Sequence, residues 1–188
     1  LVSALIRTRL LIELDATSEA LPSSGQRVLV GVPPASSHDL GALAFAVALQ
    51  TLGQRVVFLG AELPSDQWRH AWHSTGAGAA VMSVPRVRDS EGAGRVMGAI
   101  LAAEPAARFG VGGRYQHLVP DPAIKLGHSI SYAARHLDDL LDEVADPETE
   151  SPRPSDPLAA AMEEALASVP GLVPPRQRHR RRQPSRQV

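Results

Sequence analysis

The chain has 188 residues, of which 44% are hydrophobic and 4% aromatic, with a formal net charge of −1 and no cysteine. This length allows one domain with extensions. The near-neutral charge provides no global field that would attract nucleic acid or a membrane surface, and the lack of cysteine excludes disulfides, thiolate metal sites and thiol catalysis. The lack of cysteine also fits a cytoplasmic protein. No run of 18 apolar residues is present, so the sequence predicts no transmembrane helix.

The first 25 residues predict a helix followed by a linker. Apolar residues recur at helical spacing through residues 1–20, and Pro22 and Gly25 mark the linker that follows. Because the chain begins within a helix-like pattern, we expect this helix to be the end of an upstream helical bundle.

Strand and helix patterns alternate from residue 26 to residue 146. Strands are expected at 27–32, 55–59, 79–83, 108–111 and 124–126, and helices at 39–52, 64–73, 91–103 and 133–144. Short strands that alternate with helices imply right-handed crossovers and a parallel sheet. Five such strands predict an α/β domain with a flavodoxin-like (Rossmann-like) sheet in the order 2-1-3-4-5, flanked by helices.

The composition changes after residue 146, where prolines lie among acidic residues and serines, and arginines follow. This pattern predicts a Pro- and Arg-rich tail at 147–188 that is largely disordered. Residues 158–169 are the candidate for one short helix within it.

Three loops of the predicted domain carry candidate binding residues. In the expected order, strands one, three and four are neighbours, and their carboxyl ends form the edge where open α/β domains bind ligands. The candidates are Ser36, Ser37, His38, Asp39 and Gly41 after strand one, Ser83 and Val84 after strand three, and Gly112 and Gly113 after strand four.

The residue types in these loops suit a large, metal-carrying ligand. A neutral imidazole such as that of His38 can coordinate a transition metal, and a ligating imidazole gives its other N–H to an acceptor. The hydroxyl of Ser36 or of Ser83 can accept that hydrogen bond. A glycine such as Gly41 lets a bulky ligand approach the backbone closely.

The same residues resemble the cobalamin-binding domain family. That family carries Asp-x-His-x-x-Gly after strand one, a Ser-x-Leu element after strand three and Gly-Gly after strand four. Over residues 26–146 the matching positions are His38, Gly41, Ser83, Gly112 and Gly113. Two positions depart from the pattern, because Ser36 replaces the acidic residue and Pro85 replaces the leucine.

The resemblance implies a cofactor and a way of holding it. The cofactor is cobalamin, as adenosylcobalamin or methylcobalamin, bound base-off and His-on. His38 would coordinate the cobalt from below in place of the cofactor's own base. The displaced nucleotide tail would run into the sheet edge beside Ser83 and pass Gly112 and Gly113.

Among the functions of this family, we expect a non-catalytic sensory module of a transcriptional regulator or antirepressor. It resembles B12-dependent MerR-like regulators and photoreceptors, which would act on DNA or on a DNA-binding partner, and it could form a homo-oligomer. The alternative is a corrinoid-carrying subunit of a methyltransferase or mutase system. A third hypothesis is a nucleotide ligand, with Ser36 and Ser37 holding a phosphate at a helix N-terminus.

Overall fold

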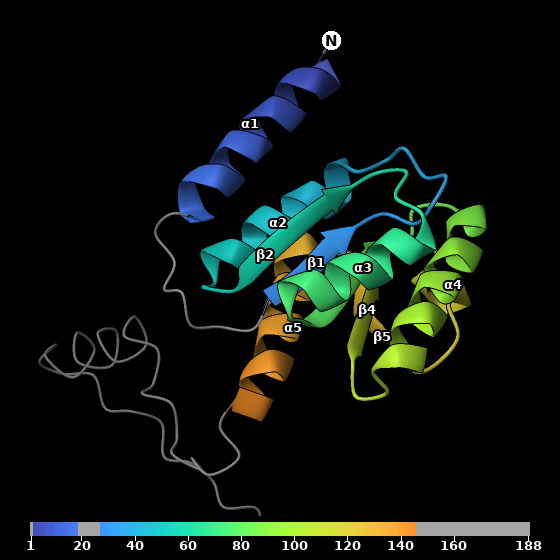
Figure 1. Ribbon diagram of the computed structural model, residues 1–188. Helices are drawn as coiled ribbons and strands as arrows, with labels where there is room; N and C mark the ends of the chain where they lie inside the picture. Colours follow the sequence, from blue (N-terminus) through green and yellow to red (C-terminus); the bar gives the residue numbers. More distant parts are fainter. Residues whose placement is uncertain (1, 19–26, 146–188) are drawn as a thin grey trace, which may run out of the picture. The chain divides into compact units, whose positions relative to one another are not determined.

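The computed structural model describes residues 2–18 and 27–145, and the second range forms a parallel sheet with helices on both faces (Figure 1). The strands are β1 (Arg27–Gly31), β2 (Arg55–Gly60), β3 (Ala77–Ser83), β4 (Arg108–Gly112) and β5 (Ile124–Gly127). The tail predicted at 147–188, with its short helix, lies outside the described residues.

The helices are α1 (Val2–Ser18), α2 (Leu40–Thr51), α3 (Ser65–Thr75), α4 (Val87–Ala103) and α5 (Ile130–Ala145), with a 3-10 turn, η1 (Gln116–Leu118). In the part of the chain that the structure describes, none of these helices combines the length and the apolar character that crossing a bilayer requires.

The sheet has the order β2-β1-β3-β4-β5, and every neighbouring pair of strands is parallel. This confirms the flavodoxin-like order predicted from the alternation of strands and helices. The carboxyl ends of β1, β3 and β4 are therefore adjacent, as the predicted crevice requires.

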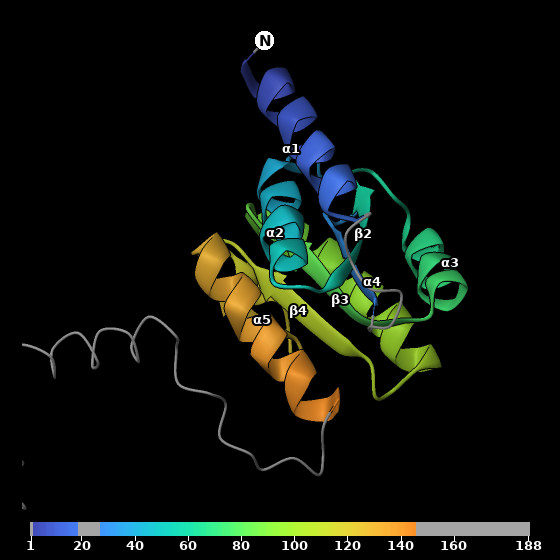
Figure 2. The ribbon, with the colours of Figure 1, turned by 90° about the vertical axis from the view of Figure 1, so that its left-hand side faces the viewer.

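Side-chain alternation along the strands builds a core on each face of the sheet. Helices α2 and α5 cover one face and α3 and α4 cover the other (Figure 2). Val28 and Val30 of β1 point to the α2/α5 face, whereas Leu29 between them packs against the α3/α4 face. Each is at most 1% exposed, and burial of one such side chain stabilises a fold by about 1.5–3 kcal/mol.

Helix α4 begins at Val87, so the predicted start at residue 91 is wrong. The helix starts earlier because a polar side chain caps it. The carboxylate of Asp89 accepts a hydrogen bond from the Arg86 N–H at 3.0 Å and so satisfies a donor at the start of the helix. Asp89 is only 2% exposed. The prediction relied on apolar spacing, which this first turn lacks.

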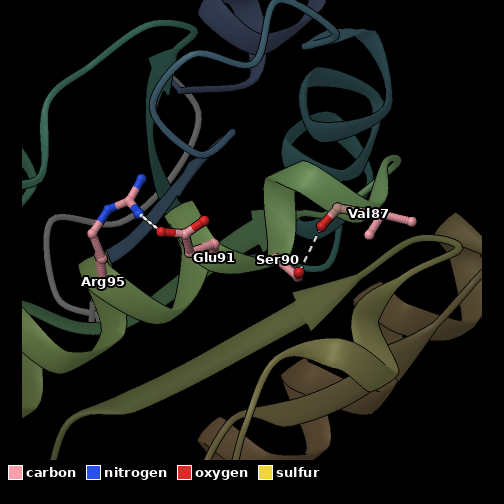
Figure 3. Close-up of polar contacts among 4 residues, drawn as sticks. All are labelled: Val87, Ser90, Glu91 and Arg95. Carbon is pink, nitrogen blue, oxygen red and sulfur yellow. Dashed lines mark hydrogen bonds and ion pairs between the residues drawn. The ribbon is translucent and has the colours of Figure 1, made fainter.

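Two further contacts stabilise the first turns of α4 (Figure 3). The Ser90 hydroxyl donates a hydrogen bond to the carbonyl oxygen of Val87 at 2.6 Å, and Arg95 pairs with Glu91 at 2.6 Å. The second pair has the i, i+4 spacing that favours helix. Both contacts lie within α4 and join side chains to positions about one turn away.

Two other helix starts also differ from the prediction. Helix α5 begins at Ile130, before the predicted residue 133. Pro64 was expected at the first helical position of α3, but it is the N-cap residue, with an extended ψ of 156°. Gly53, in contrast, follows the C-cap of α2 with a φ of 101°, which is the conformation typical of a helix-ending glycine.

Helix α1 is attached to α2 and to the loop before it by polar contacts. The buried side chain of Gln50 donates hydrogen bonds to the carbonyl of Leu14 and to the hydroxyl of Thr17. The Nε of Arg7 donates to Asp39 Oδ2 at 3.0 Å.

Helix α1 itself is exposed. No residue of α1 is buried, and its large exposed apolar side chains are Val2, Leu5, Ile6 and Ile12. That α1 ends an upstream bundle stays a prediction.

Candidate functional site

The loop between β1 and α2 contains a tight turn. The Ser36 N–H donates to the carbonyl of Pro33 at 3.0 Å, and Ala35 has a φ of 65°. This left-handed conformation costs an L-residue roughly 1–2 kcal/mol and persists only where the surroundings enforce it. The turn buries Ser36 to 1% exposure and leaves Ser37 and His38 exposed. The strained backbone therefore separates an interior hydroxyl from a solvent-facing imidazole.

The two residues at the end of this loop contact other elements. Nε2 of the exposed His38 ring is contacted by Nη2 of Arg86, which lies just before α4. Asp39 is the N-cap residue of α2, but its side chain makes no capping hydrogen bond. Its carboxylate pairs instead with Arg7 of α1, although it is only 10% exposed. The loop after β1 thus joins α1 on one side and the start of α4 on the other.

The loops after β3 and β4 are joined through their backbones at Val84. This residue is fully buried, its N–H donates to the carbonyl of Gly112 at 2.8 Å, and its own carbonyl accepts from the Tyr115 N–H at 3.1 Å. Val84 therefore holds the two loops together. Although Val84 was a candidate binding residue, it does not line either of the two cavities described below.

The Gly112-Gly113 pair lies flat between neighbouring backbone segments. Gly113 has a φ of 98°, and a Cβ added there would lie 3.0 Å from the carbonyl oxygen of Val84. Its N–H donates to the carbonyl of Gly127 at 3.0 Å. A Cβ at Gly112 would lie 3.5 Å from that same carbonyl oxygen, an ordinary contact. Glycine is thus required at 113 by both conformation and space.

A cavity of about 180 Å³ opens at the carboxyl edge of the sheet, between the strand ends and helices α2 and α5. We call it the sheet cavity. Its apolar walls come from both helices and from β1, β3 and β5, and they include Val30, Phe45, Val81, Leu126, Ile130 and Ala133. Gly41, Ser83, Gly112 and Gly113 also line it. Such walls suit a flat apolar or aromatic group.

A second cavity, of about 370 Å³, lies between α1 and the loops after β1 and β3. We call it the α1 cavity. It is more polar than the sheet cavity, and its lining includes Ser3 and Arg7 of α1 together with Ser37, His38, Asp39, Gly41, Ser83 and Pro85. Gly41 and Ser83 line both cavities, so the two cavities are adjacent at these residues.

The structure brings together most of the residues that the sequence singled out. Ser37, His38 and Asp39 lie at the α1 cavity, Gly112 and Gly113 at the sheet cavity, and Gly41 and Ser83 at both. Ser36 is buried behind the first loop. Its hydroxyl has no hydrogen-bond partner in the described structure.

Arg7 and Arg86 were not among the residues that the sequence singled out, and His128 was interpreted as a surface residue near the edge of the crevice. Arg7 and His128 line the α1 cavity and the sheet cavity, respectively, and Arg86 contacts His38. For His128 a signal existed, because it directly follows β5 and the carboxyl ends of all parallel strands lie at one edge. The same signal existed for Arg86, which lies in the loop between β3 and α4. For Arg7 none existed, since it is brought to the site by the packing of α1.

The fold is similar to that of three solved corrinoid proteins. The monomethylamine corrinoid protein of Methanosarcina barkeri matches with a TM-score of 0.54 at 18% identity, over 68% of this chain and 62% of that one. A chain of the methanol:cobalamin methyltransferase complex of the same organism gives 0.57 at 18%, over 73% and 57%. A cobalamin-binding protein of Desulfitobacterium hafniense gives 0.54 at 16%, over 74% and 70%.

The present chain therefore spans less than two thirds of the length of the first two of these proteins. At such identities the similarity is one of fold. No protein-family model and no curated protein matches the sequence.

Proposed function

We propose that residues 27–145 form a corrinoid-binding domain in which His38 is the protein ligand of the cobalt. The observation that carries this proposal is a pair of adjacent cavities that share Gly41 and Ser83, with His38 in the wall of one and Gly112-Gly113 in the wall of the other. A ligand with a metal-bearing head and a long tail could use both cavities at once. The similar folds of corrinoid proteins support this reading.

The residues of the site fit such a group in three respects. His38 is exposed and supplies an imidazole nitrogen, which is a suitable donor for cobalt. Gly112 and Gly113 line the sheet cavity without side chains, so a ligand in that cavity would meet the main chain there. The apolar walls of the sheet cavity, which include Phe45 and Leu126, suit the flat lower base of the cofactor.

In this proposal each part of the site has a defined role. His38 would ligate the cobalt, and the apolar walls of the sheet cavity would hold the displaced lower base. Ser83, which lines both cavities, would contact the tail. When bound, cobalamin would supply a cobalt centre able to carry a methyl, adenosyl or hydroxo group. The chain itself is proposed to hold and present this group without catalysing a reaction alone.

Between the two roles considered for such a domain, we propose the corrinoid-carrying subunit. Of the similar structures, one is named as a corrinoid protein and another as part of a methyltransferase complex, which favours the carrier over the sensory module. One observation is relevant to the sensory role: α1 places Ser3 and Arg7 beside His38, so a helical segment already borders the ligand site. The regulatory role and a DNA partner stay predictions.

The test is retention of cobalamin and of cobinamide, a corrinoid that lacks the nucleotide tail, after removal of free ligand by desalting. We expect the protein to retain hydroxocobalamin with a changed absorbance spectrum and to bind cobinamide about 10- to 100-fold more weakly. Burial of an apolar group of this size contributes roughly 1.5–3 kcal/mol, and each 1.4 kcal/mol corresponds to tenfold in affinity.

Equal affinity for both corrinoids would show that the sheet cavity does not hold the tail, and release of both would refute the proposed function. A second experiment distinguishes the carrier from the sensor. The protein is loaded with adenosylcobalamin in the dark, and its elution volume in size-exclusion chromatography is compared before and after illumination. A change in oligomeric state upon illumination favours the sensor, and an unchanged elution volume favours the carrier.

A further inference from the structure

The sheet cavity is apolar inside and polar at its mouth. The apolar side chains of its inner wall are at most 6% exposed and include Val30, Phe45, Val81, Leu126 and Ala133. Among the described residues, the polar side chains of its lining are those of Ser83, His128 and Ser129. These three are half-buried or exposed and lie at or just after the ends of β3 and β5. A flat group that enters past them therefore meets apolar side chains further in.

The backbone N–H groups of two glycines in this wall are already used. The N–H of Gly113 donates to the carbonyl of Gly127 at 3.0 Å, and the N–H of Gly127 donates to Oε1 of the buried Gln116 at 2.8 Å. Gly41, in the first turn of α2, is exposed and borders both cavities, so its N–H lies at the mouth. The inner wall therefore offers a ligand few hydrogen-bond donors.

Corrinoids differ in the base that ends their nucleotide tail, which can be a benzimidazole, a phenol or a purine. All three bases are flat, so the shape of a cavity distinguishes them little. A purine such as adenine carries an amino group and several ring nitrogens along its edges, whereas a dimethylbenzimidazole or a cresol presents mostly hydrocarbon. A polar group that is buried without a partner loses the hydrogen bonds that it made to water. An apolar inner wall is therefore expected to disfavour the purine.

We propose that the sheet cavity makes this chain selective for corrinoids with an apolar lower base, a benzimidazole or a phenol, over corrinoids with a purine. The inference rests on the proposed corrinoid site and adds the class of corrinoid that this site takes. The residues that set the preference are those of the inner wall, such as Val81 of β3 and Ala133 of α5. Both are at most 5% exposed, so a purine edge placed against them would find neither a protein partner nor water.

The first measurement compares two corrinoids that differ only in the base, one with p-cresol and one with adenine. Equilibrium dialysis of the wild-type protein against each of them gives the two affinities. We expect the cresol form to bind at least about tenfold more tightly, which is the typical effect of one unpaired buried polar group. Adenine can also ligate cobalt within the corrinoid through a ring nitrogen, and cresol cannot. This contribution is the same for every protein variant, so a comparison of variants removes it.

The decisive variant is Val81→Thr, which nearly keeps the shape of the side chain and adds a hydroxyl to the inner wall. We expect the preference for the cresol form to fall about fivefold, the worth of one hydrogen bond. Ala133→Ser adds a hydroxyl at another point of the same wall and should act in the same direction. The matched control is Val28→Thr. Val28 is fully buried on the same face of the sheet but does not line the sheet cavity, so this variant should keep the wild-type preference. Thermal unfolding checks that each variant is folded.

Equal affinities of the wild type for the two corrinoids would overturn the selectivity. A preference that is unchanged in both Val81→Thr and Ala133→Ser, or that falls equally in Val28→Thr, would do the same. If the wild type retains neither of these corrinoids nor hydroxocobalamin, the proposed function fails. If it binds all of them equally well, the corrinoid site stands and only the selectivity is refuted.

Discussion

Replacement of His38 by alanine is expected to lower the affinity for hydroxocobalamin by at least about tenfold and to remove the protein-induced change in its absorbance spectrum. His38 lines the α1 cavity and offers an exposed imidazole. Loss of even an outer hydrogen-bond partner of a metal ligand lowers metal affinity about 10- to 100-fold, so loss of the ligand itself should have at least this effect. Equilibrium dialysis and absorbance spectra of the two proteins measure it.

The matched control is His70→Ala. His70 is also an exposed histidine, but it belongs to α3, on the opposite face of the sheet from α2 and α5. This variant should bind as the wild type does. If His38→Ala keeps the wild-type affinity and spectrum, the cobalt is not ligated by His38. If both variants lose binding equally, the loss reflects general damage rather than a missing ligand.

Gly113→Ala is expected to destabilise the fold by about 1–3 kcal/mol, the cost of forcing a side chain into a backbone conformation that it rarely adopts. The φ of 98° excludes an unstrained alanine, and the new Cβ would lie 3.0 Å from the carbonyl oxygen of Val84. That oxygen cannot retreat easily, because it accepts a hydrogen bond from the Tyr115 N–H. Urea denaturation followed by circular dichroism gives the free energy of unfolding.

Gly112→Ala provides the neighbouring comparison. Its added Cβ would meet the carbonyl oxygen of Gly127 at 3.5 Å, which is an ordinary contact, so the free energy of unfolding should change by less than about 0.5 kcal/mol, as for an unstrained substitution. Because Gly112 lines the sheet cavity, the added methyl group is expected to narrow that cavity and to weaken cobalamin binding. Equal stability of the two variants would contradict the account of the loop after β4.

The strand order could be predicted because it follows from simple periodicity. Short apolar runs such as 27–32 are separated by helix patterns, and the rules for parallel crossovers leave few arrangements. Helix starts were harder to predict. The first turn of α4 is stabilised by the Asp89 carboxylate and the Ser90 hydroxyl, which an apolar pattern does not reveal.

The edge of the sheet that holds the candidate site was also predictable, because all carboxyl ends of parallel strands face the same way. The residues that contact His38 and its neighbour Asp39 could not be predicted in this way. Arg86 reaches it from the start of α4, and Arg7 of α1 pairs with the adjacent Asp39. Both contacts depend on how separate elements pack in space, and a single sequence carries no record of such pairs.

The most direct test of the central claim is an electron paramagnetic resonance spectrum of the protein loaded with cob(II)alamin, prepared once with ordinary and once with nitrogen-15-labelled histidine. If His38 ligates the cobalt, the axial nitrogen splitting of each cobalt line is expected to change from a triplet to a doublet upon labelling. Triplets that persist in the labelled protein would show that the cofactor keeps its own base as ligand. That result would contradict base-off, His-on binding at His38.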